Sequence, residues 1–579
     1  MKMDGDDVRN QSSGNAELLV VLALVAFGGY FAFVMLGGVR LDPTSTLWLD
    51  QGDIAQHYLG WHFFRGEPWM LPLGGNPRYG LDMGSSIVFT DSIPLLAIAF
   101  KAIRTVLPTH FQYAGLWMAF CFIAQGLSAL LLLHRFSRNP AILFAGATLF
   151  MLSPVLVSRA LGHFALMGHW TLLLALWLYF KPNSTSDSPW IWRALIATTA
   201  LIHGYLLYFV LALWFTTMLR DREAKNFRYR PCLTSFLFTV LTLAIVLWLA
   251  GWFAVPFTSA TSGGNYGQHA ANLLSLTNPV WGSPLLPTTP QSPTTSGVEA
   301  INYLGAGVFL LCVAAILRVP AASGWTTSFA RHKYLLLTTS VFAALAFSHN
   351  VYWGETLLFQ FPLNGEIQSS LELIRGSGRL LWLLHYLVMV AAIVLVLRGL
   401  PGTFAPIFLC VAVAVQAYDL HASYRNLART LKDTANVAAR DAASGLKSPF
   451  WEIAATRYQE VDFFPISHSP PRYEHIALWA GDHHIAINAA YFGRVSVERA
   501  FAQSPKLETE LTTGARRSHT LYIIQNRTDV DRLLLLPDDG IGEIDGYWIV
   551  APDWFKHATT TDLAALLGRP KTTLASALR

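Results

Sequence analysis

A series of long apolar stretches in the first 420 residues most constrains how this chain can fold. A helix needs about 20 mostly apolar residues to cross a lipid bilayer. Charged residues make up only 13% of the chain, whereas they make up roughly 25% of a soluble globular protein. The sequence therefore predicts a mainly α-helical, polytopic membrane bundle. Its eleven candidate spans are residues 17–38, 112–134, 141–157, 165–180, 190–202, 205–219, 234–255, 303–317, 334–347, 378–397 and 403–418.

Two apolar segments need a separate interpretation. Residues 190–219 are too many for one untilted span, and His203-Gly204 interrupts them, which predicts a tight hairpin of two short helices. Residues 93–107 are few and include Lys101 and Arg104. We expect this segment to form an amphipathic helix that lies in the membrane interface and does not cross the bilayer.

Basic residues indicate the orientation. Lys and Arg are frequent at 220–230 and 318–333, in loops that would share one side with the tail 1–16. By the positive-inside rule that side is cytoplasmic. The transmembrane domain, residues 17–419, then places loops 39–111 and 256–302 outside.

The character of the chain changes after the last apolar stretch. Polar and charged residues become common in residues 420–579, which predicts an extracytoplasmic α/β domain. Expected strands are residues 475–479, 484–488, 520–525, 533–537 and 547–550, and expected helices are 426–443 and 561–567.

Composition excludes some classes of site. No basic run of the kind that binds nucleic acid is present, so no nucleic-acid partner is expected. The cysteines, Cys121, Cys232, Cys312 and Cys410, lack the spacing of metal ligands. We interpret them as small, buried, apolar side chains.

The loop 39–111 is the richest in chemistry. Asp50 and Asp53 lie among tryptophans that include Trp48 and Trp61. Aromatic side chains anchor at the level of lipid headgroups, and a carboxylate can accept a proton or coordinate a metal. This pattern suits a site for a lipid-linked polar substrate, although a solvated loop with an aromatic belt is an equal alternative.

Three further outer segments carry candidate residues. Arg159 and His163 lie between two spans, where they serve a site or only the interface. Glu299 precedes a helix and is either a functional acid or a charge favoured by the helix dipole. Arg375 and Arg379, in the run Arg-Gly-Ser-Gly-Arg, offer the donor fork that binds phosphate, with ordinary headgroup contact as the alternative.

These motifs, in this order, resemble the GT-C class of membrane glycosyltransferases. Gly52-Asp53-Ile54-Ala55-Gln56-His57-Tyr58 is similar to a stretch in the endoplasmic-reticulum glucosyltransferases that extend dolichol-linked oligosaccharide. Ser153-Pro154 with Gly162-His163-Phe164, and Asp91-Ser92-Ile93-Pro94-Leu95, resemble two further elements of that class. As a whole, the chain resembles a bacterial family of GT-C-like membrane proteins.

The resemblance implies an inverting glycosyltransferase of the bacterial inner membrane. Its partners would be membrane lipid, a polyprenyl-phosphate-linked sugar donor, and an envelope glycan or lipid as acceptor. Asp53 would be the general base, and Arg375 or Arg379 would neutralise the leaving phosphate. Because Asp50 departs from the tight acid pairs of other class members, a divalent cation is left open. The other residues expected at the substrate are Asp50, His57, Arg159, His163 and Glu299.

Two other functions compete with this one. A lipid or polysaccharide transporter would place ionisable groups inside its spans, whereas the acids here lie in outer loops, which favours the enzyme. A non-catalytic scaffold would use residues 420–579 to bind an envelope partner.

Overall fold

The computed structural model describes residues 4–49, 52–223, 229–256, 266–318, 325–374, 376–400, 402–441, 445–467, 469–556 and 566–569. The chain forms two compact units. Unit 1 comprises residues 1–43, 113–244 and 263–433, and unit 2 comprises residues 44–112, 245–262 and 434–579.

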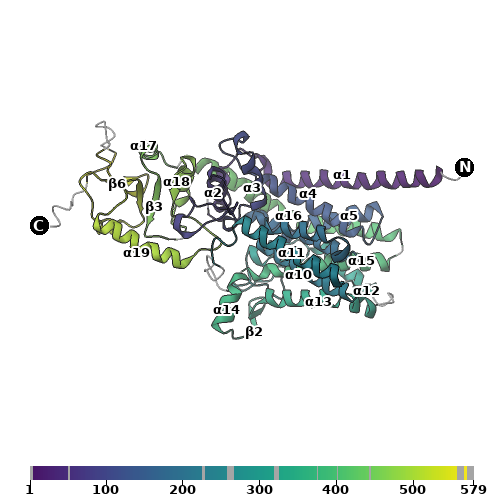
Figure 1. Ribbon diagram of the computed structural model, residues 1–579. Helices are drawn as coiled ribbons and strands as arrows, with labels where there is room; N and C mark the ends of the chain where they lie inside the picture. The colour runs from purple at the N-terminus through teal and green to yellow at the C-terminus, as the bar shows by residue number, and fades with distance from the viewer. Residues whose placement is uncertain are drawn as a thin grey trace. The chain divides into compact units, whose positions relative to one another are not determined.

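Unit 1 is a bundle whose long helices lie side by side (Figure 1). A short antiparallel hairpin, β1 (Asn350–Trp353) with β2 (Thr356–Gln360), follows helix α13. The helices are α1 (Asp4–Leu41), α4 (Ala114–Leu133), α5 (Pro140–Met151), α6 (Pro154–Val157), α7 (Trp170–Tyr179), α8 (Ser184–Asp187), α9 (Pro189–Ala200), α10 (Gly204–Arg222), α11 (Tyr229–Ala250), α12 (Ala306–Arg318), α13 (Trp325–Phe347), α14 (Gly365–Leu371), α15 (Trp382–Gly399) and α16 (Phe404–Asp441).

Several of these helices are long and apolar enough to cross a membrane, as in an integral membrane protein. Within the described ranges they are Gly14–Leu41, Ala114–Leu133, Tyr229–Ala250, Ser377–Gly399 and Phe404–Ala435. The pair Pro140–Met151 and Pro154–Leu161, bent by 43°, adds a sixth if it counts as one span. The number of eleven spans and the orientation of the helices in the membrane remain predictions.

The two segments that needed separate interpretation have clear structures. The hairpin prediction is confirmed, because α9 and α10 pack together and the His203 ring accepts a hydrogen bond from the Tyr205 amide at 3.1 Å, which caps α10. Within residues 93–107, the α-helix α3 (Pro94–Ala102) has nine residues and is followed by a 3-10 turn, Arg104–Val106. At 1.5 Å per residue such a helix is about 14 Å long, too short for a bilayer core of about 30 Å.

Unit 2 contains a five-stranded mixed sheet with the order β4-β3-β5-β7-β6. Strand β3 (Glu460–Phe464) runs parallel to β4 (Ala486–Ile487) and β5 (Thr520–Ile524), whereas β7 (Tyr547–Ala551) is antiparallel to β5 and to β6 (Gly540–Ile544). The helices of this unit are α2 (Gly52–Gly66), α3, α17 (Phe450–Arg457), α18 (Tyr473–Asp482), α19 (Val497–Thr513) and α20 (Arg527–Val530).

Residues from the early loop and from the C-terminal segment share one hydrophobic core in unit 2. Leu59 and Phe63 of α2 and the ring of Tyr79 are buried against side chains such as Trp451 and Ile476. The Tyr79 main chain also forms a parallel bridge with strand β4. An α/β unit with a sheet is therefore present, and its core includes residues far apart in the sequence.

The expected strands and helices of the C-terminal segment have mixed outcomes. Strands were expected correctly at β4, β5 and β7, and residues 426–441 are helical as part of α16. The strand prediction for residues 475–479 is wrong, because these residues lie in helix α18. The strand prediction for residues 533–537 is also wrong, because they form no strand of the sheet. Most of the helix expected at 561–567 lies outside the described residues.

Candidate functional site

Unit 1 gathers three of the residues selected from the sequence around the carboxylate of a fourth, Glu299. The Glu299 carboxylate pairs with Nη1 of Arg159 at 3.0 Å and with Nε2 of His163 at 2.9 Å. Its Oε2 atom also accepts a hydrogen bond from Nε of Arg379. The side chain of Arg159 is 1% exposed, whereas that of His163 is 25% exposed, so the cluster reaches the surface at the histidine.

Short 3-10 turns next to the helices position these side chains. Arg159 lies in Ser158–Leu161, Glu299 in Val298–Ala300 and Arg379 in Ser377–Leu381. Asn302 joins two of these turns, because its side-chain amide donates to the Gly378 carbonyl at 3.1 Å. The buried His385 ring holds the Asn302 carbonyl at 3.0 Å, which anchors the Glu299 segment to α15.

The glycines of the Ser-Gly-Arg element make room for the cluster. A Cβ atom at Gly376 would lie 2.9 Å from Nε of Arg379, and one at Gly378 would lie 2.9 Å from the His269 carbonyl oxygen. The Gly376 amide donates to the Tyr205 hydroxyl at 2.9 Å, and the Arg379 guanidinium lies 4.7 Å from the centre of the Tyr205 ring. The glycines thus permit a packed arrangement in which Arg379 faces Glu299.

The electrostatics of this cluster favour an anion. Burial alone would raise the pKa of Glu299, but the guanidinium groups of Arg379 and Arg159, with His163, hold that pKa well below its usual range. One carboxylate thus faces two permanently charged guanidinium groups, which leaves net positive charge. Such a site suits phosphate, to which arginine donates in a planar fork.

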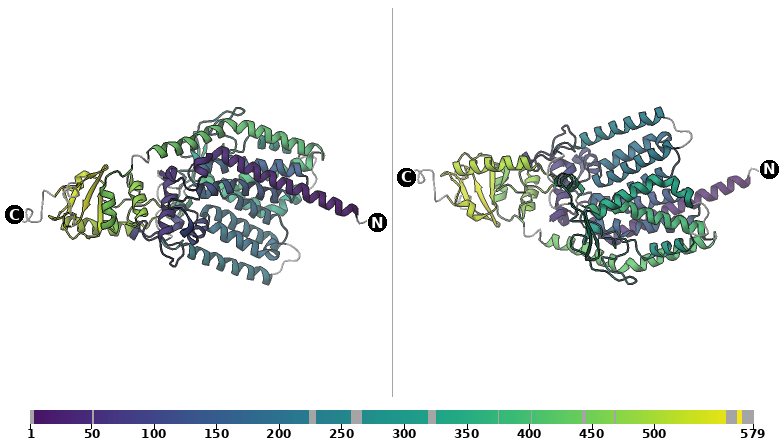
Figure 2. Two further views of the ribbon diagram at one scale, coloured as in Figure 1. Left: turned by 90° about the horizontal axis from the view of Figure 1, so that it is seen from above. Right: turned by 90° about the horizontal axis from the view of Figure 1, so that it is seen from below.

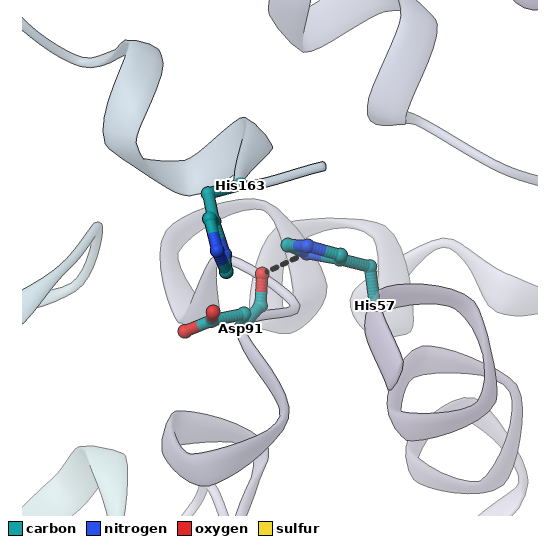
Figure 3. A group of neighbouring side chains, drawn as sticks. All are labelled: His57, Asp91 and His163. Atoms are coloured by element: carbon teal, nitrogen blue, oxygen red, sulfur yellow. Dashed lines mark hydrogen bonds between the residues drawn. The ribbon is translucent and has the colours of Figure 1, made fainter. Parts of the chain in front are cut away.

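In unit 2, residues of the early loop surround the first two turns of α2. Asp53 lies in the first turn, is exposed, and makes no hydrogen bond or ion pair within the described part of the chain. His57, one turn later, lies on the same helical face. Its Nδ1 atom donates to the Asp91 carbonyl oxygen at 2.7 Å (Figure 3).

The turn at Asp91 is built to hold α2. Asp91 has a φ of 52°, in the left-handed region, and ends a 3-10 turn. The Ser92 hydroxyl donates to the His57 carbonyl at 2.7 Å, and the Gln56 amide donates to the Phe89 carbonyl at 3.0 Å. These bonds tie the first two turns of α2 to this turn.

His57 and Asp91 carry atoms of the type that bind a divalent cation. A neutral His57 that donates through Nδ1 keeps Nε2 as an acceptor, the tautomer that metal-bound histidines commonly adopt. A typical protein metal centre uses three or four protein ligands, so these two residues of unit 2 are by themselves an incomplete set. A divalent cation stays an open alternative, as it was from the sequence.

The residues selected from the sequence thus have different outcomes. Asp50 and Arg375 lie outside the described residues. Arg159, His163, Glu299 and Arg379 come together in unit 1, and Asp53 and His57 share one face of α2 in unit 2. The roles assigned to all of them remain predictions.

Sequence reasoning missed the residues that support the Glu299 cluster. Asn302, Tyr205 and His385 orient its turns from three different parts of the chain. Only Asn302 gave a signal, as a polar residue beside Glu299 at the edge of an apolar stretch.

Unit 2 also has a small charged pocket of about 100 Å³. Arg517, just before β5, pairs there with Glu460 and Asp462 of β3 and, at 3.2 Å, with Glu510 of α19. Burial raises the pKa of Asp462 to about 6, and the nearby carboxylates add to that effect while Arg517 opposes it. Three acids around one guanidinium leave this pocket with excess negative charge.

We expect Asp462→Asn to change how the stability of the protein depends on pH. The folded pKa of about 6 lies above the ordinary value of 3.8, so the folded state holds more protons than the unfolded state between these values. The Asp462 contribution to stability is therefore present below about pH 4 and is lost as the pH rises through 6. Thermal unfolding in detergent should show that the variant gains stability relative to wild type, on the order of 2 kcal/mol, between pH 4.5 and 7.5. An unchanged difference between variant and wild type across this range would contradict the expectation.

Comparisons with known proteins complete the description. The structure is similar to the archaeal oligosaccharyltransferase AglB from Archaeoglobus fulgidus in complex with an inhibitory peptide and a dolichol-phosphate. That match has 10% identity and a TM-score of 0.41, and it covers 87% of this chain and 69% of the other. An apo form of an Archaeoglobus fulgidus oligosaccharyltransferase matches with 9% identity and a TM-score of 0.38, covering 81% and 64%. No curated protein matches by sequence.

Family models match most of the chain. The model described as Domain of unknown function (DUF6311) matches residues 25–421. The model described as DUF6311 C-terminal domain matches residues 450–552. Because the first family model matches more than half of the chain, the chain belongs to the DUF6311 family.

Proposed function

We propose that the chain is a glycosyltransferase that moves a sugar from a polyprenyl-phosphate-linked donor to an extracytoplasmic acceptor of the bacterial envelope. The observation that carries this proposal is the Glu299 cluster, in which Arg159, His163 and Arg379 converge on a single acid. All four residues of this cluster lie in unit 1.

The chemistry of sugar transfer needs such a cluster. When the bond between the anomeric carbon and the phosphate oxygen breaks, negative charge builds on the leaving phosphate. Fixed cations that already face this position stabilise the charge without reorganising. Arg159 and Arg379 are held by Glu299 and by the aromatic rings of Trp382 and Tyr205, so they are oriented before any ligand binds.

The acceptor hydroxyl needs a base, and this role falls to Asp53. The assignment rests on the resemblance of residues 52–58 to the GT-C motif. It is supported by the exposure of the carboxylate and by its position in the first turn of α2. A positioned carboxylate can take the proton as the new glycosidic bond forms.

One observation favours a transporter as a second candidate. A buried polar network lies inside the bundle, where the Tyr386 hydroxyl contacts Nδ1 of His169 at 2.7 Å and the Gln125 amide at 3.1 Å. Polar and ionisable groups within spans often mark a substrate path. The network is fully packed among aromatic rings, such as that of Trp382 at 4.2 Å from His169, which favours a structural role.

The proposed function is tested by comparing the envelope glycans and glycolipids of cells that carry or lack the chain, using mass spectrometry. We expect one sugar decoration to disappear without the chain and to return with the wild-type gene. Reconstituted proteoliposomes provide the second arm. Transfer of labelled sugar from a lipid-linked donor supports the enzyme, whereas lipid flipping without transfer would replace it with the transporter.

Arg379→Gln should weaken donor binding. The variant loses one charge-assisted donor to phosphate, an interaction that contributes roughly 1.5–3 kcal/mol, so the KM for the donor should rise about 10- to 100-fold. Arg379→Lys keeps the charge but loses the planar fork of donors, so its KM for the donor should lie between those of wild type and Arg379→Gln. Arg193→Gln, an arginine of α9 outside the cluster, is the matched control. Equal KM values for Arg379→Gln and the control would remove Arg379 from the site.

A further inference from the structure

A large cavity of about 700 Å³ lies in unit 1 between α1, α5 and α16. It is distinct from the Glu299 cluster, since none of that cluster's side chains lines it. Its wall is mostly apolar and includes Phe27 and Phe31 of α1 and Phe144 of α5. Helices α1 and α16 contain candidate membrane spans, and α5 belongs to the bent pair that adds a sixth if it counts as one span.

Defined contacts join the helices around the cavity. The Phe31 and Tyr424 rings lie 6.0 Å apart, and the Tyr424 hydroxyl donates to the Leu152 carbonyl at 2.7 Å. Nε of Arg40, at the end of α1, donates to the Leu431 carbonyl at 2.8 Å and ties α1 to α16. Figure 2 shows α1 in purple and α16 in green as the long helices concerned.

One end of the cavity is strongly basic. His421, Arg425, Arg429 and Lys432 of α16 line it, and their spacing of four, four and three residues places them on one helical face. All four are exposed, and none forms a salt bridge with another described residue. The nearest acid in sequence is Asp433, while Asp419 is buried and bonded to the Tyr303 hydroxyl at 2.7 Å.

The Lys432 side chain is also packed into this end. A Cβ atom at Gly37 would lie 3.2 Å from Cγ and from Cε of Lys432, and Gly37 has a φ of 72°. Its alkyl chain therefore lies across the glycine where α1 departs from helical geometry.

We propose that this cavity binds an anionic phospholipid of the surrounding bilayer, with its chains between α1, α5 and α16 and its phosphate headgroup against the basic stripe. An apolar compartment with cations at one end is complementary to such a molecule. Residues on the outer faces of the same helices, Phe33 at 58% and Ile407 at 62% exposed, would be in contact with bilayer lipid. A bilayer lipid can therefore enter from the side. The site is separate from the proposed transferase chemistry.

The test measures lipid binding by native mass spectrometry of the full chain in detergent. Phosphatidylglycerol and phosphatidylcholine of the same chain length are titrated separately. For wild type we expect phosphatidylglycerol to bind at least tenfold more tightly. The double variant Arg425→Gln/Arg429→Gln should lose this preference, whereas Arg138→Gln, an exposed arginine on the loop between α4 and α5, should keep it.

A second variant guards against misfolding and tests the cavity itself. Ala417→Phe fills the cavity without changing its charge and should reduce binding of both lipids, while the thermal unfolding temperature stays close to that of wild type. The proposal is overturned if wild type shows no preference for phosphatidylglycerol, or if the double variant keeps it. Tighter binding of polyprenyl phosphate than of phosphatidylglycerol would also overturn it and assign the cavity to a carrier lipid.

Discussion

Asp53→Asn is expected to lower the rate of sugar transfer by about 10²- to 10⁴-fold, the range that a positioned general base contributes. Asparagine keeps the size of the side chain and its place in the first turn of α2, but it cannot take the proton of the acceptor hydroxyl. The effect should appear in kcat, because donor binding does not depend on this carboxylate. The measurement is transfer of labelled sugar from a lipid-linked donor, with the purified full chain in lipid nanodiscs.

The variant should otherwise behave as wild type. Asp53 is exposed and makes no hydrogen bond to another described residue, so its replacement removes no contact that holds unit 2 together. Glu366→Gln, in the first turn of α14 and also exposed, is the matched control and should leave transfer unchanged. If Asp53→Asn retained transfer within threefold of wild type, the base would have to be another residue.

Glu299→Gln is expected to cause the largest loss of stability. The substitution leaves the buried Arg159 and Arg379 side chains without the charge that compensates them, and breaking one side of a buried ion pair typically costs about 3–5 kcal/mol. Arg159 is the more affected of the two, since its side chain is only 1% exposed. The measurement is thermal or denaturant unfolding of the purified chain in detergent.

The pH dependence of this loss provides an independent check. Because the pKa of Glu299 is held well below its usual range, its stabilising contribution is present at neutral pH and is lost only as the pH falls through that low value. The difference between variant and wild type should therefore be the same at pH 8 and pH 9, where histidine side chains such as the paired His163 are ordinarily neutral. Glu355→Gln, an exposed acid in the β1–β2 turn, should be neutral at both. A stability of Glu299→Gln equal to that of this control would show that the arginines do not depend on Glu299.

The membrane bundle was predictable because it depends on local composition. A run of apolar residues crosses a bilayer whatever surrounds it, and His203-Gly204 marked the α9–α10 turn directly in the sequence. Local composition was a poorer guide in unit 2. Residues 475–479 have the short apolar run of a strand but lie in helix α18, and periodicity alone cannot separate the two for so short a run.

Strand β3 was not among the strands expected from the sequence. Two acids in five residues, Glu460 and Asp462, are more typical of a solvated loop than of a buried strand. In the structure both acids are paired with Arg517, more than 50 residues later. Only a partner that is distant in the sequence makes acids tolerable in a buried strand. The Glu299 cluster was foreseen as separate residues, but their meeting depends on Asn302 and on glycines whose role is visible only in three dimensions.

Unit 2 cannot close its core until the ribosome has made its last segment. Residues 44–112 emerge first, but the side chains that cover Leu59, Phe63 and Tyr79 come from residues 450–567. At roughly 5–20 residues per second, the roughly 450 residues from residue 112 to residue 567 take roughly 20–90 s to synthesise. During that interval the early segment lacks most of the side chains that cover it, because only Val255 of the described residues in the intervening stretch belongs to this core. We therefore expect a chaperone or the lipid surface to shield residues 44–112 until residues 450–567 have been made.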